Sequence, residues 1–434
     1  MRKRAYVLIV SDAEVYNGQV KGCVSMNNWK RNVWILFICQ FLVLGAMTMI
    51  MPFLPLYLQE LGVEGEKQIS IWSGIIFGAN FLTAFLFSPF WGRVADRHGR
   101  KLMVLRSGFG MAVVIILTGF ATGPFELLGL RLLNGVVSGF IPASIALVAT
   151  NTPKQHVGYA LGTLNSGAVA GAICGPLFGG LMAEAFGFRM IFNITGLCIL
   201  LAAVVVLFLV KEETKPGSEA KVERSNAIKD FKRVTKHSPM MSLFIVGFLV
   251  QFALLGMNPL IPLFVQKLTS GENVALFAGI ATSVMGIANM VASPKLGKMG
   301  DVKGSQHVLY YSLIGAAIFS IPQAFVQELW QLIALRFLLG LCIGGLLPSV
   351  NSLVKGLSPV GMESRTYSFS NSAIYLGNLL GPITGGWIVA GFGTRGLFLF
   401  AGFILLVSVV YVKRRVLPIL NRKHHIYQTK EIPS

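Results

Sequence analysis

The chain has 434 residues, of which 54% are apolar and 13% charged, with a net charge of +19. Soluble domains usually contain about 45–50% apolar and about 25% charged residues, so this composition argues against a soluble enzyme or a disordered protein. The basic residues lie at the ends of apolar runs, which indicates membrane orientation rather than nucleic-acid binding. These runs are long and continuous, and they predict membrane-spanning helices rather than a β-barrel.

Twelve apolar segments follow one another, and each approaches the roughly 20 residues that a spanning helix needs. They cover residues 33–57, 70–91, 102–121, 126–149, 157–182, 190–210, 240–265, 274–293, 308–325, 330–353, 367–389 and 396–412. Residues 1–32 form an N-terminal tail in which Met1 and Met26 are both candidate initiators, so 1–25 are candidates for lying upstream of the true start. Residues 413–434 form a basic tail.

A polar stretch, residues 211–239, divides the segments into two sets of six. We expect it to be a solvated linker with some amphipathic helix, joining bundles formed by residues 33–210 and 240–412. Placing both termini in the cytoplasm puts nearly all Lys and Arg on that side, as the positive-inside rule requires. The exceptions are Lys67, Arg189, Lys267 and Arg395 on the other side, and Arg131 and Arg336 within segments.

The two sets of segments repeat each other at an offset of about 205 residues. The repeated patterns are Ser-Pro-x-x-Gly-x-x-x-Asp-x-x-Gly from Ser88 and from Ser293, Arg-x-x-x-Gly-x-x-x-Gly from Arg131 and from Arg336, and Gly-Pro-x-x-Gly-Gly from Gly175 and from Gly381. Because each repeat has six helices, both have the same orientation in the membrane. Parallel repeats of this kind are typical of secondary transporters that work by alternating access.

Three motifs resemble signatures of the major facilitator superfamily. Gly92-Arg-Val-Ala-Asp96-Arg97-His-Gly99-Arg100-Lys101 resembles its loop 2–3 signature, with valine where leucine is usual, and Arg131-Leu-Leu-Asn134-Gly135 resembles its fourth-helix signature. Gly171-x-x-x-Gly175-Pro176-x-x-Gly179-Gly180 resembles the fifth-helix signature of its drug:proton antiporters. The resemblance covers residues 33–412 and implies an all-α membrane protein with twelve helices in two pseudo-symmetric six-helix bundles.

The resemblance implies a conformational latch in loop 2–3. Asp96 lies among Arg97, Arg100 and Lys101 at a helix end, where a carboxylate can accept charge-assisted hydrogen bonds and hold the halves together. Asp301 is its copy, but the basic residues around it are fewer, so we expect the latch mainly in the first half. Alternatively, the basic residues only set the topology.

Arg131 is an intramembrane charge, which is costly and therefore a candidate for proton coupling, although it can instead extend to the interface. No Asp or Glu lies in the middle of a segment, so the candidates for coupling are Asp96, Arg131 and Glu126, followed by Asp301 and Glu184. In the fifth helix, Gly171, Gly175 and Gly179 share one face, while Pro176 can bend the helix. We expect these residues and Gly180 to govern helix approach and gating; plain packing is the alternative.

By resemblance, helices 1, 4, 7 and 10 line the substrate cavity. The candidate lining residues are Gln40, Phe41, Asn134, Gln251, Phe252, Met257, Asn258 and Asn351. Amides, aromatic rings and methionines suit an adaptable pocket for varied ligands, although each residue taken singly also fits core packing.

We expect a monomeric exporter of amphipathic drugs in the bacterial plasma membrane, driven by a proton gradient. The chain has no Gly-x4-Gly-Lys-Ser/Thr phosphate loop, so we expect no ATP, and its five cysteines form no Cys-x-x-Cys pair, so we expect no metal. The placement of the basic residues argues against a nucleic-acid partner, and no nucleophile with a base is visible, so we expect no enzymatic activity and no cofactor besides the proton gradient. Two other readings stay open. One is a facilitator that exports one metabolite or imports a sugar with protons, and the other is a membrane receptor or scaffold that does not transport.

Overall fold

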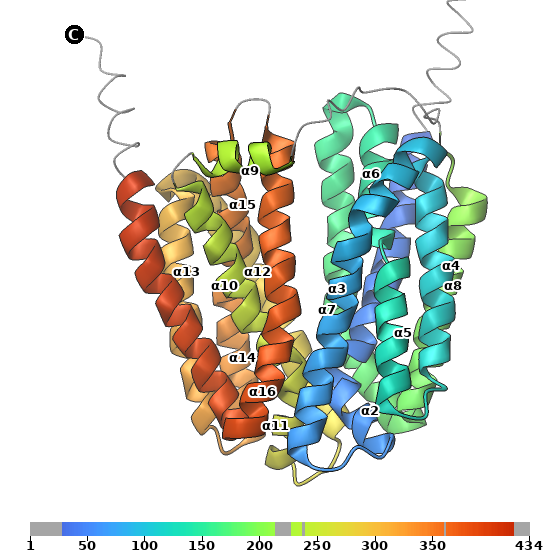
Figure 1. Cartoon of the computed structure of the whole chain (residues 1–434), viewed down its shortest axis with the longest axis vertical. Coiled ribbons are helices and arrows are strands. Elements are labelled where there is room, and N and C mark those ends of the chain that lie inside the picture. Colours follow the sequence, from blue (N-terminus) through green and yellow to red (C-terminus); the bar gives the residue numbers. More distant parts are fainter. Residues whose placement is uncertain (1–27, 213–226, 237–238, 360–361, 421–434) are drawn as a thin grey trace, which may run out of the picture.

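The computed structural model describes residues 28–212, 227–236, 239–359 and 362–420 (Figure 1). Eleven helices in this part are long and apolar enough to cross a membrane. The last, Arg365–Leu420, is 56 residues long and contains Gly393 at φ 70° and ψ 177°, so it comprises two spans joined at that residue. The prediction of a twelve-helix all-α membrane protein is confirmed. The predictions for residues 1–27 and 421–434 lie outside the described residues.

The first half contains six spans. Its elements are a helix over 28–50, η1 (Met51–Phe53), α2 (Leu54–Glu60), α3 (Glu66–His98), α4 (Arg100–Thr118), α5 (Pro124–Val137), α6 (Phe140–Asn151), η2 (Lys154–His156), α7 (Val157–Phe186) and α8 (Phe188–Leu209). The fourth span breaks between α5 and α6 at Gly139, whose φ of 127° favours glycine. Arg106 of α4 donates to the freed carbonyl of Ser138 at 2.9 Å, so the break keeps a hydrogen-bond partner.

The second half repeats this plan. Its elements are α10 (Met240–Met257), η3 (Asn258–Leu260), α11 (Ile261–Leu268), α12 (Val274–Lys303), α13 (Ser305–Ser320), η4 (Ile321–Phe325), α14 (Leu329–Ile343), α15 (Leu346–Leu357), α16 (Glu363–Tyr411) and η5 (Val412–Val416). The first span of each half breaks at a proline, Pro52 or Pro259, and the fourth span of each half breaks at glycine. The sequence repeat is therefore also a repeat of helix breaks.

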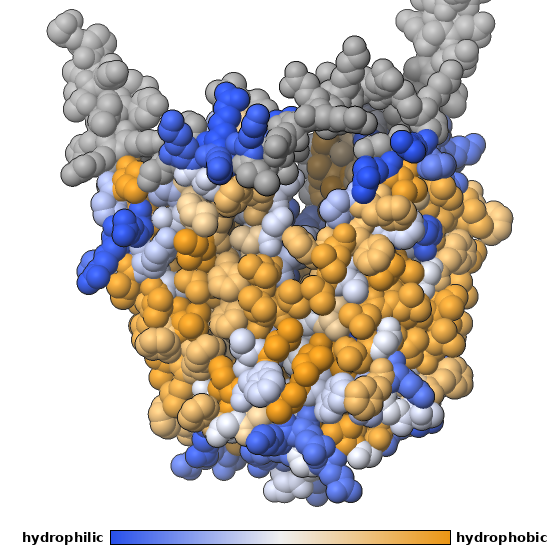
Figure 2. All heavy atoms as spheres, viewed as in Figure 1, coloured by the Kyte–Doolittle hydropathy of each residue, from blue (hydrophilic) through white to orange (hydrophobic). Residues whose placement is uncertain are grey.

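The two halves stand side by side as separate bundles, with the described ends of the chain at the same end of the molecule (Figure 1). α9 (Ala227–Thr235), which falls within the predicted linker, lies at that end, here called the α9 side. The opposite end carries α2 and α11 and is called the α2 side. Hydrophobic residues cover the middle of the molecule between two hydrophilic ends, as a membrane-spanning protein requires (Figure 2).

Candidate functional site

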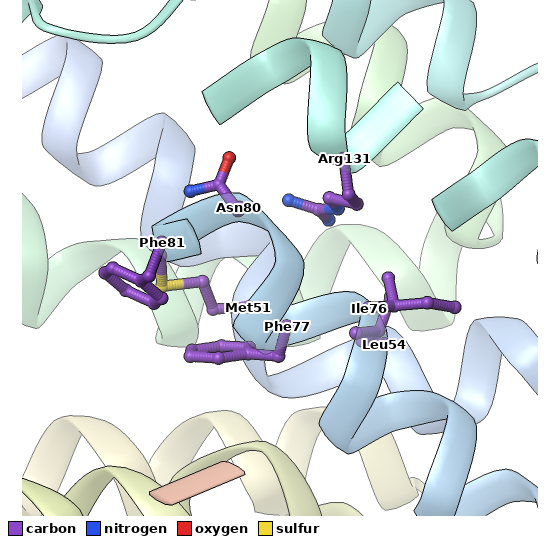
Figure 3. A pocket seen from close by; sticks show the side chains of 7 residues that line it. All are labelled: Met51, Leu54, Ile76, Phe77, Asn80, Phe81 and Arg131. Atoms are coloured by element: carbon purple, nitrogen blue, oxygen red, sulfur yellow. The ribbon is translucent and has the colours of Figure 1, made fainter. Parts of the chain in front are cut away.

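The first half buries a guanidinium in a small pocket between its first, second and fourth spans. Arg131 of α5 is 8% exposed and lies beside Asn80 of α3 (Figure 3). The other lining residues are Met51, Leu54, Ile76, Phe77 and Phe81. The cavity measures about 10 Å³, close to the smallest space that holds one water molecule. Arg131 therefore lies inside the bundle and does not extend to the interface.

Asn80 connects this pocket to the fourth span. The Asn134 side chain is 1% exposed and donates its Nδ2 hydrogen to Asn80 Oδ1 at 2.9 Å. One turn further along α3, the Thr83 hydroxyl donates to the Leu132 carbonyl at 2.8 Å. Sequence reasoning missed Asn80; an amide in the middle of the apolar segment 70–91 was the available signal, because buried amides need partners.

The second half contains a matching site around Arg336 of α14. This side chain is fully buried, and its Nη1 lies 3.5 Å from Asn258 Oδ1 and 3.5 Å from Met285 Sδ. By the sequence repeat, Asn258 corresponds to Met51 and Met285 corresponds to Asn80. Each arginine thus has one amide and one methionine as neighbours, but the two neighbours have exchanged places between the halves.

Both guanidinium groups keep nitrogens without hydrogen-bond partners, namely Nε of Arg131 and Nε and Nη2 of Arg336. The ion pairs recorded among the described residues lie elsewhere, at Arg189–Glu60, Lys267–Glu66 and Arg365–Asp230. An unpaired buried donor is costly, so each site favours a guest that accepts hydrogen bonds. Guanidinium stays protonated in proteins. Arg131 can therefore orient a water molecule or a hydrogen-bond acceptor, but it does not release and rebind the transported proton.

Glu126, a candidate for proton coupling, lies in the first turn of α5 and is exposed. Its Oε2 accepts hydrogen bonds from the Thr122 backbone N–H at 2.9 Å and from the Thr122 hydroxyl at 3.0 Å. The carboxylate therefore sits at the start of the span on the α2 side, in contact with solvent. The ion pairs recorded among the described residues do not join it to Arg131, which lies inside the bundle.

In the loop 2–3 motif, the described contacts are with the first half and with the start of the linker. Gly99 has a φ of 93°, and the next two backbone N–H groups, of Arg100 and Lys101, donate to the Glu212 carboxylate at 2.8 and 3.1 Å. Glu212 thus caps the N-terminus of α4, where a negative charge is stabilising. A side chain at position 99 would displace this carboxylate, while the positive φ of Gly99 is what favours glycine there. Sequence reasoning missed Glu212, which follows the sixth apolar segment.

The remaining residues of the motif lie at the surface of the α9 side. Gly92, Arg97 and the second-copy Asp301 are exposed. The side chain of Asp96 lies outside the described part of the structure, so its place in a latch between the halves stays a prediction. The described motif residues bring no basic side chain together with Asp301.

The glycines of the fifth span make close contacts on two faces of α7. A side chain at Gly171, Gly175 or Gly179 would collide with backbone atoms of the first span. A side chain at Gly180 would meet the Ala275 carbonyl of α12, and one at Gly279 would meet the Pro176 carbonyl. The same arrangement recurs where α16 of the second half crosses α3 of the first half. There, a side chain at Gly386 would meet the Ser70 carbonyl. Small residues thus allow the halves to approach closely at both crossings.

The α2 side is closed by contacts between the halves. Gln59 and Gln266, which correspond by the repeat, exchange side-chain hydrogen bonds of 3.1 and 3.4 Å. Beside them, Lys267 Nζ lies 2.7 Å from Glu66 Oε1. The Glu184 carboxylate of α7 accepts the Ala275 backbone N–H of α12 at 3.0 Å. Toward the α9 side, by contrast, a groove lies between the described parts of α3, α10 and α16, and a hollow is visible between the bundles there (Figure 2).

A model of the Major Facilitator Superfamily matches residues 36–277 and 271–425 of the chain. The chain belongs to the Major Facilitator Superfamily. Multidrug resistance protein MdtG of Escherichia fergusonii is 41% identical to it, over 88% of this chain and 94% of that protein. The MdtG protein of Serratia proteamaculans is 40% identical, over 88% and 93%. The expectation of a transporter rather than an enzyme is confirmed by this membership.

Solved structures of other transporters share the fold of this major facilitator. A bacterial homologue of the human lysosomal transporter Spinster, in an inward-facing and unoccupied conformation, matches with a TM-score of 0.74 at 15% identity. The match covers 89% of this chain and 96% of that one. The nucleoside transporter NupG matches with a TM-score of 0.72 at 16% identity, over 88% and 98%.

The predicted cavity residues of this major facilitator occupy several environments. Gln40 is fully buried, and both polar atoms of its side chain lack partners. Gln251 donates to Asn378 Oδ1 at 3.1 Å, while Met257 is buried and its Sδ lies 3.8 Å from the Ser320 hydroxyl. The others lie against neighbouring spans: Phe41 beside Gly171, Phe252 against Phe248 and Phe400, Asn258 at Arg336, and the Asn351 carbonyl at the Tyr367 hydroxyl. The structure thus brings Asn258 and Asn134 to the arginine sites.

Proposed function

We propose that this chain exports amphipathic drugs across the bacterial plasma membrane in exchange for protons, by alternating access. The identity of about 40% to multidrug resistance proteins over nearly their whole length carries this proposal. The duplicated bundles support the mechanism, because they are closed together on the α2 side and apart on the α9 side. We place the α9 side and both termini in the cytoplasm, since the basic residues gather there.

In this scheme, Arg131 and its neighbour Asn80 hold a water or a substrate acceptor group in the first half, and Arg336 does so in the second. Proton exchange would then use a carboxylate outside these sites, with Asp96 and Glu126 as the candidates. Glu126 is supported by its solvent contact near the N-terminal end of the span that carries Arg131. We propose a monomer in the bilayer that needs no cofactor besides the proton gradient.

The test is ethidium efflux from cells that express the chain, with ATP held constant. Adding a protonophore should abolish efflux, and Arg131→Gln should reduce it strongly while leaving expression unchanged. Glu328→Gln is a suitable control, because this exposed glutamate caps α14 on the α2 side through contacts that glutamine can largely keep. Uptake instead of efflux would contradict the export direction. Efflux that survives the protonophore would contradict proton coupling.

A further inference from the structure

A large groove separates the two halves on the α9 side. It lies between α3 of the first half and α10 and α16 of the second, and measures about 600 Å³. Pockets that bind small molecules usually measure about 300–1,000 Å³. The lining residues belong mainly to the apolar spans α3, α10 and α16, and several of them are exposed, so the groove opens on the apolar surface of the molecule. The groove is therefore large enough for a ligand and accessible from the membrane.

The groove is almost entirely apolar. Seven of its fifteen lining residues are Phe or Tyr, and the others are Leu, Ile, Met and Ala apart from Ser372. Phe85, Tyr375 and Met241 are 47%, 47% and 45% exposed, so their side chains face the open space. An apolar space beside lipid chains is filled by hydrocarbon, because water in it would lose hydrogen bonds without replacement. The default occupant is thus an acyl chain of the adjacent leaflet.

α9 lies at the mouth of this groove and is amphipathic. On its apolar face, Phe231 lines the groove, and the centroid of its ring lies 5.2 Å from that of Phe369. Val234 on the same face is fully buried. The opposite stripe carries the exposed basic residues Lys229, Lys232 and Arg233 at helical spacing, and the exposed Lys236 directly follows the helix. The acid between them, Asp230, is paired with Arg365 at 3.0 Å. A helix with this pattern suits the interface of a membrane that contains anionic lipids.

We propose that the groove binds an anionic phospholipid, with one acyl chain between α3, α10 and α16 and the phosphate beside Lys229 and Lys232. Charge complementarity at the mouth selects the headgroup, and the aromatic lining holds the chain. The bound chain fills the space between the parts of α3, α10 and α16 nearer the α9 side, so the lipid stabilises the state in which these parts are apart. This site is independent of the direction of transport and of the transported compound.

The experiment uses the purified full-length protein in detergent micelles at low salt. The probe is phosphatidylglycerol with a pyrene-labelled acyl chain. The comparison lipid has the same chains and a phosphocholine headgroup. The charge variant is Lys229→Gln with Lys232→Gln. Its matched control is Lys295→Gln with Lys298→Gln, an exposed pair with the same spacing on α12. The groove-filling variant is Leu82→Trp.

The control for Leu82→Trp is Ile287→Trp. The repeat places Ile287 at the equivalent position of α12, where this helix packs against α7 of the first half. The two residues are 39% and 43% exposed. Removing both lysines should weaken phosphatidylglycerol binding about 25-fold, since one basic residue near an anionic lipid contributes about a factor of five. Binding of the phosphocholine lipid should hardly change. Filling the groove should weaken both lipids about fivefold or more.

The proposal is overturned if the two lipids bind equally to the unsubstituted protein. It is also overturned if replacing Lys229 and Lys232 weakens phosphatidylglycerol binding no more than replacing Lys295 and Lys298 does. It is also overturned if Leu82→Trp weakens ethidium binding but not lipid binding, because the groove would then be a drug site. The lysines are exposed, so their variants keep the test decisive if Leu82→Trp does not fold.

Discussion

Polar contacts between the halves contribute to closure of the α2 side, and removing two of them should shift the equilibrium toward opening. The two are the reciprocal pair of Gln59 and Gln266 and the ion pair of Lys267 with Glu66. The contact of Glu184 with the Ala275 backbone is left in place. The double variant Gln266→Ala with Lys267→Ala removes both at once. The glycine contacts between the halves remain, so the variant perturbs the equilibrium without unfolding either bundle.

The size of the effect follows from the geometry. Each amide hydrogen bond contributes about 0.5–1.5 kcal/mol, and the longer one, at 3.4 Å, belongs at the low end. The Lys267 and Glu66 side chains are 50% and 38% exposed, so their ion pair contributes about 0.2–1 kcal/mol. The sum of about 1–3 kcal/mol multiplies the ratio of open to closed molecules on this side roughly 5- to 150-fold.

The assay is a distance measurement between spin labels at Glu64→Cys and Glu272→Cys, on exposed loops of the two halves, after the native cysteines are replaced. The double variant should increase the population at longer distances. The control is Lys67→Ala with Gln68→Ala, which removes the same residue types from an exposed stretch on the same side. An unchanged distance distribution, or an equal change in the control, would refute the role of these contacts in closure.

Three further predictions concern single positions. Gly180→Leu should open the α2 side in the same spin-label assay, because the side chain meets the α12 backbone; Gly158→Leu, with open space around it in the same helix, should not. Glu212→Ala should lower the stability of the first half by about 0.5–2 kcal/mol, seen as a lower melting temperature than for Glu272→Ala, since it removes the cap of α4. Arg336→Met should leave the melting temperature unchanged or raise it while reducing efflux, because it removes an unsatisfied buried charge; a large fall in melting temperature would show that the arginine stabilises the fold.

The helices and their duplication were predictable from the sequence because long apolar runs and glycine-rich repeats are local signals. The breaks at Gly139 and Gly344 were not, because glycine is common throughout the spans and only tertiary contacts decide where one interrupts a helix. Asn80 and Glu212 were missed for the same reason. Each acquires its role from a partner on another helix, at a distance in sequence that no local pattern encodes.

The exchange of Met51 and Asn80 for Asn258 and Met285 has a consequence for how each arginine is accommodated. The guanidinium tolerates an amide from either neighbouring span. Each half therefore keeps the combination of one amide and one methionine, but not the position of either residue. Installing both Met51→Asn and Asn80→Met would give the first half the arrangement of the second. Ethidium efflux by such a molecule, with the same lining around both arginines, would show whether the difference between the two linings is needed for transport.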